Sequence, residues 1–351
     1  MPKDLSGLMS TITKKLKGSV KIQRVADVVT PYHIKYRTGI MSLDIALNGG
    51  FPAGTIVQLW GHKGVGKDYL SNLMLAAAQQ DYGDEANLFW TSFGYKPDKP
   101  FMEMCGVVLE GLGNLWFVDV DKKGEVHPSE AMLSAALDIV KSNEFQIGVI
   151  NELGSGETKE NVKKKLHEEA KVATWASLMS DFCRKYYSVM RVVVEGVPNK
   201  TLIVMINPVR ANMDSKTSRW QKHIQTSGEA LQHAKAIDVE LKHQKWIKEG
   251  EGEEAKKIGK VIKWRVIKGK HGISEGAEGS FSFYHGLGVD LEEDLVNVGR
   301  SYGLITAAGA WFSVPWSDKT IQGMAKVKAS LRANPEARAE LETAIWEKVR
   351  A

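Results

Sequence analysis

The stretch that most constrains the fold combines a short apolar run, a glycine-rich loop and a helical pattern between residues 55 and 80. The run TIVQLW has the length and composition of a buried strand, and YLSNLMLAAAQQ has the pattern of a helix. Between them, GHKGVGK matches G-x-x-x-x-G-K, in which backbone N–H groups surround phosphate oxygens and the lysine reaches the terminal phosphates. We therefore predict a nucleotide-binding loop here; a glycine-rich turn with a chance lysine is the alternative.

The residue that follows the loop lysine departs from this motif. Asp68 stands where a neutral Ser or Thr hydroxyl usually ligates Mg²⁺. A carboxylate could also ligate the metal, but it would bring a negative charge toward the triphosphate, which is unfavourable where the site is desolvated. The loop thus predicts nucleotide binding and leaves hydrolysis in doubt.

Further apolar runs alternate with helical segments along the chain. NLFWTSF, IGVI and TLIVMIN each have the character of a buried strand, so we predict an α/β fold with a mostly parallel sheet covered on both faces. Between Val239 and Lys268, two strand-like runs flank the charged tip KEGEGEEAKK, which predicts a hairpin. LSGLMSTITKKLK predicts an amphipathic N-terminal helix, followed by an extended piece, VKIQRVADVV. After Tyr284 the composition turns helical, with a last helix from Pro335 onward.

Composition excludes several classes of protein. The 351 residues, 43% of them hydrophobic, suffice for a sizeable core. Two cysteines far apart in the sequence, Cys105 and Cys183, argue against a disulfide framework and for a reducing compartment. The N-terminus lacks the pattern of a signal peptide, and no apolar run approaches the roughly 20 residues of a membrane helix. The net charge of +5 permits a nucleic-acid partner without requiring one.

Several segments together resemble the RecA recombinases of bacteria and their phage relatives. RTGIMSLDIALNGGFPAGTIVQLWGHKGVGK resembles the entry to their ATPase core, and MSDFCRK, INPVR, TSGEAL, VIKGK and GAWFSVPWSDKTIQG follow in the family's order. The likeness covers nearly the whole chain. It implies a RecA-type P-loop core, a helical filament on DNA, and ATP with Mg²⁺ between protomers. The parts that we expect are an N-terminal helix-and-strand protomer-docking segment over 1–38, an ATP- and DNA-binding core over 39–284, and a small C-terminal α/β domain over 285–351.

The resemblance also implies residues around the nucleotide. Asp98 and Phe101 occupy the positions of an acid and an aromatic residue that hold the adenine, although Phe101 could belong only to the core. Lys268 and Lys270 match a pair that reaches the neighbouring protomer's phosphates, although they could be a solvated strand end. The expected nucleotide-binding residues are Gly61, Gly64, Gly66, Lys67, Asp68, Tyr69, Asp98, Phe101, Asn151, Lys268 and Lys270, with Asp68 also a candidate Mg²⁺ ligand.

The hydrolytic positions of the family are altered in this chain. An ungapped register puts Gly94 at the position of the catalytic glutamate, and a one-residue slip puts Phe93 there; neither can polarise water. Asn151 replaces the Walker B aspartate, and Pro208 replaces the glutamine that senses the γ-phosphate. With Asp68, these changes affect four parts of one phosphoryl-transfer apparatus, so we expect weak or absent turnover.

Two features could restore hydrolysis. Glu152 directly follows Asn151, the location that some other P-loop ATPases use for their catalytic glutamate. Asp68 could itself replace the missing metal ligand. Glu152 is therefore the candidate catalytic residue of this chain.

Two loops that bind single-stranded DNA in the family follow the Walker B and sensor strands. The first carries a run of three lysines, which flanking glutamates could make merely a solvated helix face. The second surrounds Trp220 with cations, a combination that unstacked bases favour; a tryptophan buried between protomers is the alternative. The expected DNA-binding residues are Lys163, Lys164, Lys165, Ser180, Arg184, Arg210, Lys216, Arg219, Trp220, Lys222, Ser227 and Gly228.

These observations predict a RecA-like homologous recombination protein. It would form an ATP-bound helical filament on single-stranded DNA and pair it with homologous double-stranded DNA, with weak or absent hydrolysis. The alternative is a non-enzymatic pseudo-ATPase that binds DNA or regulates another filament. We expect a cytoplasmic protein with no membrane partner and with a loading or single-strand-binding partner. The ending EKVRA lacks an acidic tail, which favours a phage-encoded or divergent member.

Overall fold

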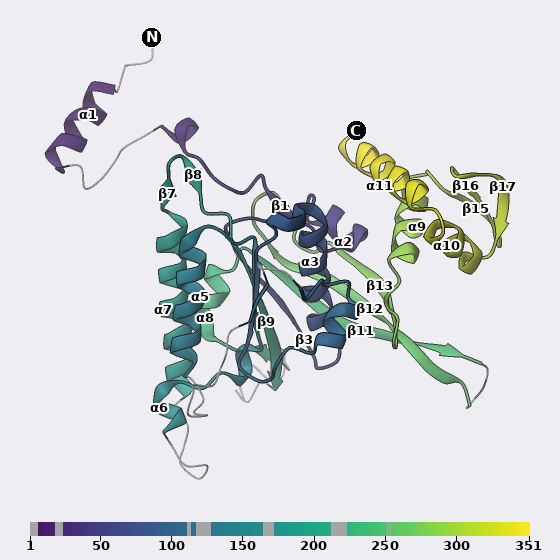
Figure 1. The fold of residues 1–351 in the computed structure, drawn as a ribbon, viewed down its shortest axis with the longest axis horizontal. Helices are drawn as coiled ribbons and strands as arrows, with labels where there is room; N and C mark the ends of the chain where they lie inside the picture. The colour runs from purple at the N-terminus through teal and green to yellow at the C-terminus, as the bar shows by residue number, and fades with distance from the viewer. Residues whose placement is uncertain are drawn as a thin grey trace.

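The computed structural model describes residues 6–17, 24–110, 114–116, 128–163, 172–211, 223–250, 252 and 254–351. Figure 1 shows a central sheet with helices on both faces, a long hairpin that projects from one edge, and a smaller domain at the C-terminus. Within these ranges, no helix combines the length and the apolar character needed to cross a membrane.

The core is built on one large sheet. Among the described residues it has ten strands in the order β14-β13-β12-β11-β3-β9-β6-β4-β5, with β10 beside β9. The strands from β11 to β5 run parallel, whereas β12, β13 and β14 continue the sheet antiparallel. The predicted mostly parallel sheet is confirmed. The strands are β3 (Ile56–Gly61), β4 (Leu88–Ser92), β5 (Asn114–Trp116), β6 (Ile147–Asn151), β9 (Leu202–Ala211), β10 (His223–Gln225), β11 (Ile237–Glu249), β12 (Lys256–Gly269), β13 (Glu278–Tyr284) and β14 (Gly288–Val289).

Both faces of the sheet are covered because its central strands are apolar on both sides. Alternate residues of β3 enter different cores: Val57 and Leu59 pack with α3, and Ile56 packs with α5 and α7. This follows from the two-residue period of a strand. The helices of the core are α2 (Met41–Ala46), α3 (Lys67–Tyr82), α4 (Lys99–Met104), α5 (Ser129–Ser142), α6 (Lys159–Val162), α7 (Val172–Met190) and α8 (Gly228–Ala234).

The hairpin of β11 and β12 is confirmed and fixes where the site lies. β11 pairs parallel with β3 from Ile237 opposite Val57 to Leu241 opposite Gly61. β3 ends there, but β11 continues to Glu249 and returns as β12. The hairpin therefore projects past the sheet edge at which the phosphate loop begins (Figure 1).

The N-terminal segment is helical at first, as predicted. α1 (Ser6–Lys15) has no buried residue. Part of the expected extended piece, residues 20–23, lies outside the described residues. Of the rest, Arg24 and Val28 are extended, whereas Val25–Asp27 form a 3₁₀ turn (η1) with a hydrogen bond from the Val28 N–H to the Val25 carbonyl oxygen at 3.1 Å. An ion pair joins Arg24 to Asp27 at 3.0 Å. The remaining short elements are η2 (Gly83–Glu85), η3 (Leu153–Ser155), β1 (Lys35–Tyr36) paired with β2 (Phe51–Pro52), and β7 (Val193–Val194) paired with β8 (Val197–Pro198).

The C-terminal region has a hydrophobic core of its own, which includes Val296, Leu331 and Leu341. Its last helix begins at Pro335, as predicted, where the Asn334 side chain accepts a hydrogen bond from the Ala337 N–H at 3.1 Å. A three-stranded antiparallel sheet lies between its helices. The elements are α9 (Leu291–Ser301), β15 (Thr306–Ala308), β16 (Trp311–Val314), β17 (Ser317–Gln322), α10 (Met324–Arg332) and α11 (Pro335–Arg350).

Candidate nucleotide and DNA site

The phosphate loop leaves the end of β3 and enters α3. Gly61 passes so close to the neighbouring strand that a Cβ would collide with the carbonyl oxygen of Leu241. Gly64 and Gly66 have φ of +73° and +83°, which side chains disfavour and which bend the chain into a loop at the helix N-terminus. The loop therefore has the glycine conformations expected of the predicted phosphate-binding loop.

Lys67, the first residue of α3, is turned into this loop. Its Nζ donates hydrogen bonds to the carbonyl oxygens of Gly61 at 3.1 Å and His62 at 3.0 Å. Burial lowers the pKa of Lys67, while the carboxylates of Asp68 and Glu152 oppose that shift. The Lys67 side-chain nitrogen therefore lies inside the loop, where phosphate oxygens would bind.

Asp68 belongs to a polar cluster that we define as Asp68, Tyr95 and Asn151. Its Oδ1 accepts hydrogen bonds from Tyr95 Oη at 3.0 Å and from Asn151 Nδ2 at 2.7 Å. Asn151 Nδ2 also lies 2.6 Å from Tyr95 Oη. Burial raises the pKa of Tyr95, and the neighbouring Asp68 carboxylate raises it further. The phenol therefore remains a donor at neutral pH and partly neutralises the carboxylate.

Sequence reasoning missed Tyr95. It directly follows Gly94 in the loop after β4, while Asp68 lies in the first turn of α3 and Asn151 ends β6. The carboxyl ends of neighbouring parallel strands meet at one sheet edge, so these three elements converge. The available signal was a polar aromatic residue beside the position of the lost glutamate.

The cluster also fits a magnesium ion. Asn151 is buried, and its Oδ1 has no hydrogen-bond partner among the described residues. A carboxylate oxygen and an amide oxygen are ligands of the kind that Mg²⁺ accepts. Asp68 and Asn151 are thus the residues that would hold it.

The other hydrolytic positions lie around this cluster. Gly94 offers no polar side chain, and a Cβ added there would lie in ordinary contact with the Ser155 side chain at 3.4 Å. Glu152 is half-buried, and its Oε2 accepts a hydrogen bond from the Ser155 hydroxyl at 3.4 Å. Pro208 on β9 lies directly opposite Gly61. The altered positions therefore adjoin the phosphate loop.

A cavity of about 360 Å³ extends from the cluster toward α4. Asp68, Tyr95, Asp98 and Phe101 all line it, so the structure brings the expected adenine residues beside the loop. Asp98 also caps α4 by accepting the Phe101 N–H at 3.2 Å. The Tyr69 side chain, in contrast, is buried. Its hydroxyl accepts a hydrogen bond from the Val289 N–H at 2.9 Å, so Tyr69 packs against β14.

The expected trans-acting lysines lie at the end of β12. Lys268 Nζ donates to the carbonyl oxygens of Gln232 at 2.6 Å and His233 at 3.3 Å, both on α8, and Lys270 is exposed. The segment that follows the second expected DNA loop thus contacts Lys268 directly.

The structure describes only some of the residues that we expect to bind DNA. Lys164, Lys165, Lys216, Arg219, Trp220 and Lys222 lie outside the described residues. Lys163 is exposed after α6. Arg210, near the end of β9, contacts η3, where its Nη2 donates a hydrogen bond to the Gly154 carbonyl oxygen at 2.7 Å.

A tight turn leads into α8. Ser227 and Gly228 have φ of +81° and +72°, and Ser227 Oγ accepts a hydrogen bond from Trp175 Nε1 at 3.0 Å. Ser180 and Arg184 lie on α7, where Arg184 is paired with Asp181. No sequence pattern singled out Trp175, which lies on α7 and donates this hydrogen bond to the turn.

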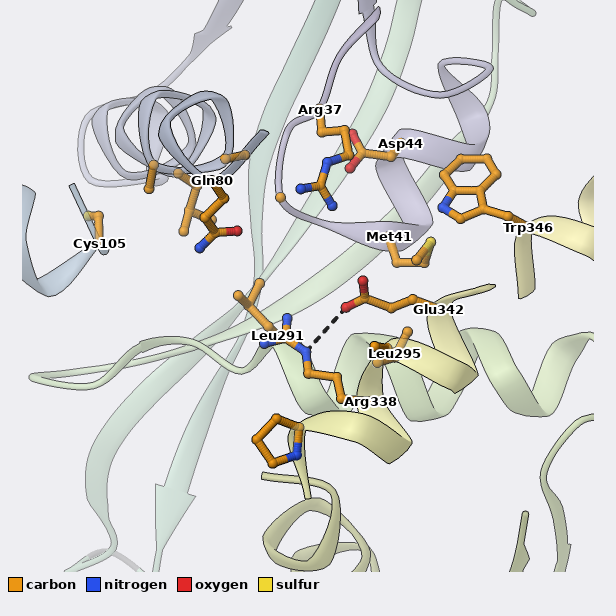
Figure 2. Close-up of a pocket in the computed structure, with 16 residues that line it drawn as sticks. Arg37, Met41, Asp44, Gln80, Cys105, Leu291, Leu295, Arg338, Glu342 and Trp346 are labelled. Carbon is orange, nitrogen blue, oxygen red and sulfur yellow. Dashed lines mark ion pairs between the residues drawn. The ribbon is translucent and has the colours of Figure 1, made fainter. Parts of the chain in front are cut away.

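A second cavity, of about 310 Å³, lies at the other end of α3 against the C-terminal region (Figure 2). Its arginines are paired with carboxylates: Arg338 Nε lies 3.2 Å from Glu342, and Arg37 Nε lies 2.9 Å from Asp81. Asp44 is buried there, and desolvation raises its pKa to about 7. The first pair lies within α11 and the second within the core, and the cavity between them is separate from the phosphate loop.

Comparison with known proteins gives a consistent result. The model of the RecA N-terminal domain matches residues 3–290, and that of the RecA C-terminal domain matches residues 293–350. Protein RecA of Francisella tularensis subsp. novicida (strain U112) is 28% identical over 347 residues, which are 98% of this chain and 89% of the relative. Protein RecA of F. tularensis subsp. tularensis (strain SCHU S4 / Schu 4) gives the same values. With its fold, its phosphate loop and this coverage, the chain belongs to the RecA family.

Proposed function

We propose that this RecA-family recombination protein uses ATP as a clamp between protomers of a filament on single-stranded DNA and hydrolyses it slowly. The observation that carries the proposal is the cluster of Asp68, Tyr95 and Asn151. Asp68 and Asn151 stand where the family has a hydroxyl and an aspartate, and Tyr95 directly follows Gly94, the position of the family's glutamate. The phosphate loop beside the cluster keeps its glycines and its lysine.

The binding half of the site supports the clamp. The glycine-rich loop, the N-terminus of α3 and Lys67 together offer N–H groups and a cation to phosphate. The cavity lined by Asp98 and Phe101 adjoins the loop and has room for a base. ATP held here would meet Lys268 and Lys270 from the next protomer.

The hydrolytic half supports slow turnover. Tyr95 keeps its proton because its pKa is raised, and the Asn151 amide has no basic nitrogen. Asp68 is engaged by both. Glu152 is the acid nearest in sequence to Asn151, and it is turned to the Ser155 hydroxyl. None of the three cluster residues, Asp68, Tyr95 and Asn151, is placed to orient and deprotonate water.

Magnesium would be held by Asp68 and Asn151. When bound, the ion would neutralise phosphate charge. Asp68, which carries a negative charge where a hydroxyl is usual, would then be offset by the ion. The protein would need Mg²⁺ for tight ATP binding more than a hydroxyl-bearing loop does.

DNA would bind at the sheet edge formed by the carboxyl ends of the parallel strands, where the phosphate loop also lies. The turn at Ser227 and Gly228 presents backbone N–H groups at the start of α8, next to the expected second loop. Lys163 and Arg210 add positive charge along this edge. Lys268 contacts α8, so nucleotide and single-stranded DNA would act on adjoining segments. Homologous duplex DNA would then pair with the coated strand.

A phosphate-release assay with saturating single-stranded DNA, beside a nucleotide-binding measurement, tests the proposal. We expect tight ATP binding with turnover near background. Turnover of several per minute that disappears in Glu152→Gln would instead assign the catalytic role to Glu152 and refute the clamp.

The alternative of a pseudo-ATPase module rests on the same altered positions. Electron microscopy with single-stranded DNA, with and without ATP and Mg²⁺, separates the two. Long filaments that require ATP support the recombination protein, whereas discrete particles at DNA ends would support a regulator of another filament.

A further inference from the structure

The hairpin places a second lysine on the phosphate loop. Lys260, on β12, donates a hydrogen bond from Nζ to the carbonyl oxygen of Gly64, at the apex of the loop. A Cβ built on Gly64 would lie 4.0 Å from this nitrogen. The two residues are 196 positions apart, and the projecting hairpin brings them together.

The placement of Lys260 is specific to one face of β12. Ile262, two residues on, is buried and lies against Gly66, so residues 260 and 262 both face the loop. The Lys260 ammonium also lies 5.4 Å from the centre of the Phe283 ring, which is directly across the sheet. Phe283 is packed edge-on against Tyr69 at 5.0 Å. These rings hold the lysine stem beside the loop.

Lys260 differs electrostatically from its neighbours on the hairpin. Lys242 is paired with Glu240 at 2.8 Å, and Lys263 is paired with Glu278 at 2.7 Å. In the described part of the chain, no ion pair joins Lys260 to a carboxylate. Burial lowers the pKa of Lys260, and nothing acidic opposes that shift. A half-buried cation without an anion is unfavourable unless an anion binds beside it.

We propose that Lys260 is an additional nucleotide-site residue, supplied by the same protomer, that raises the affinity of the loop for the phosphate chain. The C=O and N–H of one peptide unit point in opposite directions, so an ammonium on the Gly64 oxygen turns the Val65 N–H away from itself and toward the phosphate. The added positive charge also offsets Asp68. Lys260 thus acts as a positioning residue through the Gly64–Val65 peptide, and this role rests on the proposed nucleotide binding.

The test measures binding of ATP, inorganic tripolyphosphate and adenosine to the full chain, without metal and at two salt concentrations. We expect Lys260→Met to weaken ATP and tripolyphosphate by about tenfold each, as for loss of a charge-assisted hydrogen bond, to reduce their salt dependence, and to leave adenosine unchanged. Lys260→Arg should retain most of the affinity. Lys263→Met, on the opposite face of β12, is the matched control and should bind as the wild type does.

Lys260→Gln separates the charge from the hydrogen bond, because it keeps an N–H donor. Tripolyphosphate binding by Lys260→Gln that equals the wild type overturns the proposal, and so does unchanged binding by Lys260→Met. Thermal unfolding of each variant identifies any loss of fold. A wild type that binds tripolyphosphate but not ATP would refute the proposed function while leaving the comparison of lysine variants valid.

Discussion

The two halves of the nucleotide site have different chemical characters. On one side, Gly61, Gly66 and Lys67 belong to the glycine-rich loop for which we propose phosphate binding, and Lys260 adds a cation. On the other, Asp68, Tyr95 and Asn151 bond to one another. Phosphate binding needs a backbone cradle and a cation, whereas hydrolysis also needs a base, a metal ligand and a sensor at separate positions. The two abilities can therefore be separated within one site.

Restoring the hydrolytic half should have the largest effect. Gly94→Glu combined with Asp68→Thr returns a carboxylate and a neutral hydroxyl, and the new Cβ at position 94 would be in ordinary contact with the Ser155 side chain at 3.4 Å. We expect DNA-dependent turnover to rise at least about 100-fold, the usual scale for general acid–base catalysis. A steady-state phosphate assay measures this, with Gly94→Gln combined with Asp68→Thr as the control. No gain despite unchanged ATP binding would mean that the lost residues do not limit the rate.

A substitution in the binding half should weaken ATP binding without affecting the cluster of Asp68, Tyr95 and Asn151. Lys67→Met removes the buried ammonium, and hydrogen bonds to charged groups contribute about 1.5–3 kcal/mol. We expect ATP affinity to fall about tenfold to 100-fold in an equilibrium titration. Lys63→Met changes an exposed lysine of the same loop and should have little effect. Equal losses in both variants would show that overall charge, and not the buried geometry, sets the affinity.

The smallest expected effect is at the boundary between the halves. Tyr95→Phe removes a donor to Asp68, so the carboxylate would repel phosphate more strongly. We expect ATP affinity in EDTA to fall about fivefold, in line with about 1 kcal/mol for a hydrogen bond, and the difference to shrink in Mg²⁺. Isothermal titration in both buffers measures it, with Tyr302→Phe in the C-terminal region as control. A larger loss in Mg²⁺ than in EDTA would contradict this role.

Local patterns predicted much of the fold but little of the cluster. Strands such as β3 and β9 are continuous apolar runs, and α3 follows a glycine-rich loop, so each could be recognised within its own segment. A small C-terminal α/β domain was predicted, but its short strands β15 and β16 were not located individually, because three or four residues carry too little alternation. The 3₁₀ turn at Val25–Asp27 is a single local turn within a mostly apolar run, which the run's composition does not distinguish from an extended piece.

The site residues that were missed are those defined by distant contacts. Tyr95 is 27 positions from Asp68 and 56 from Asn151, and its role exists only once β4 and β6 lie side by side. Lys260 is one of many lysines on a charged hairpin, and only the packing of β12 on the loop distinguishes it from Lys263. Sequence spacing cannot supply these contacts, because they depend on sheet order.

The nucleotide recovered from DNA-bound protein tests the central claim most directly. Wild-type protein would be mixed with single-stranded DNA, Mg²⁺ and radiolabelled ATP, and kept for an interval far longer than one turnover of a working DNA-dependent ATPase. The complex would then be isolated by rapid gel filtration and its nucleotide separated by chromatography. The separation of binding from hydrolysis predicts that intact ATP is recovered with the complex. Recovery mainly of ADP would contradict it.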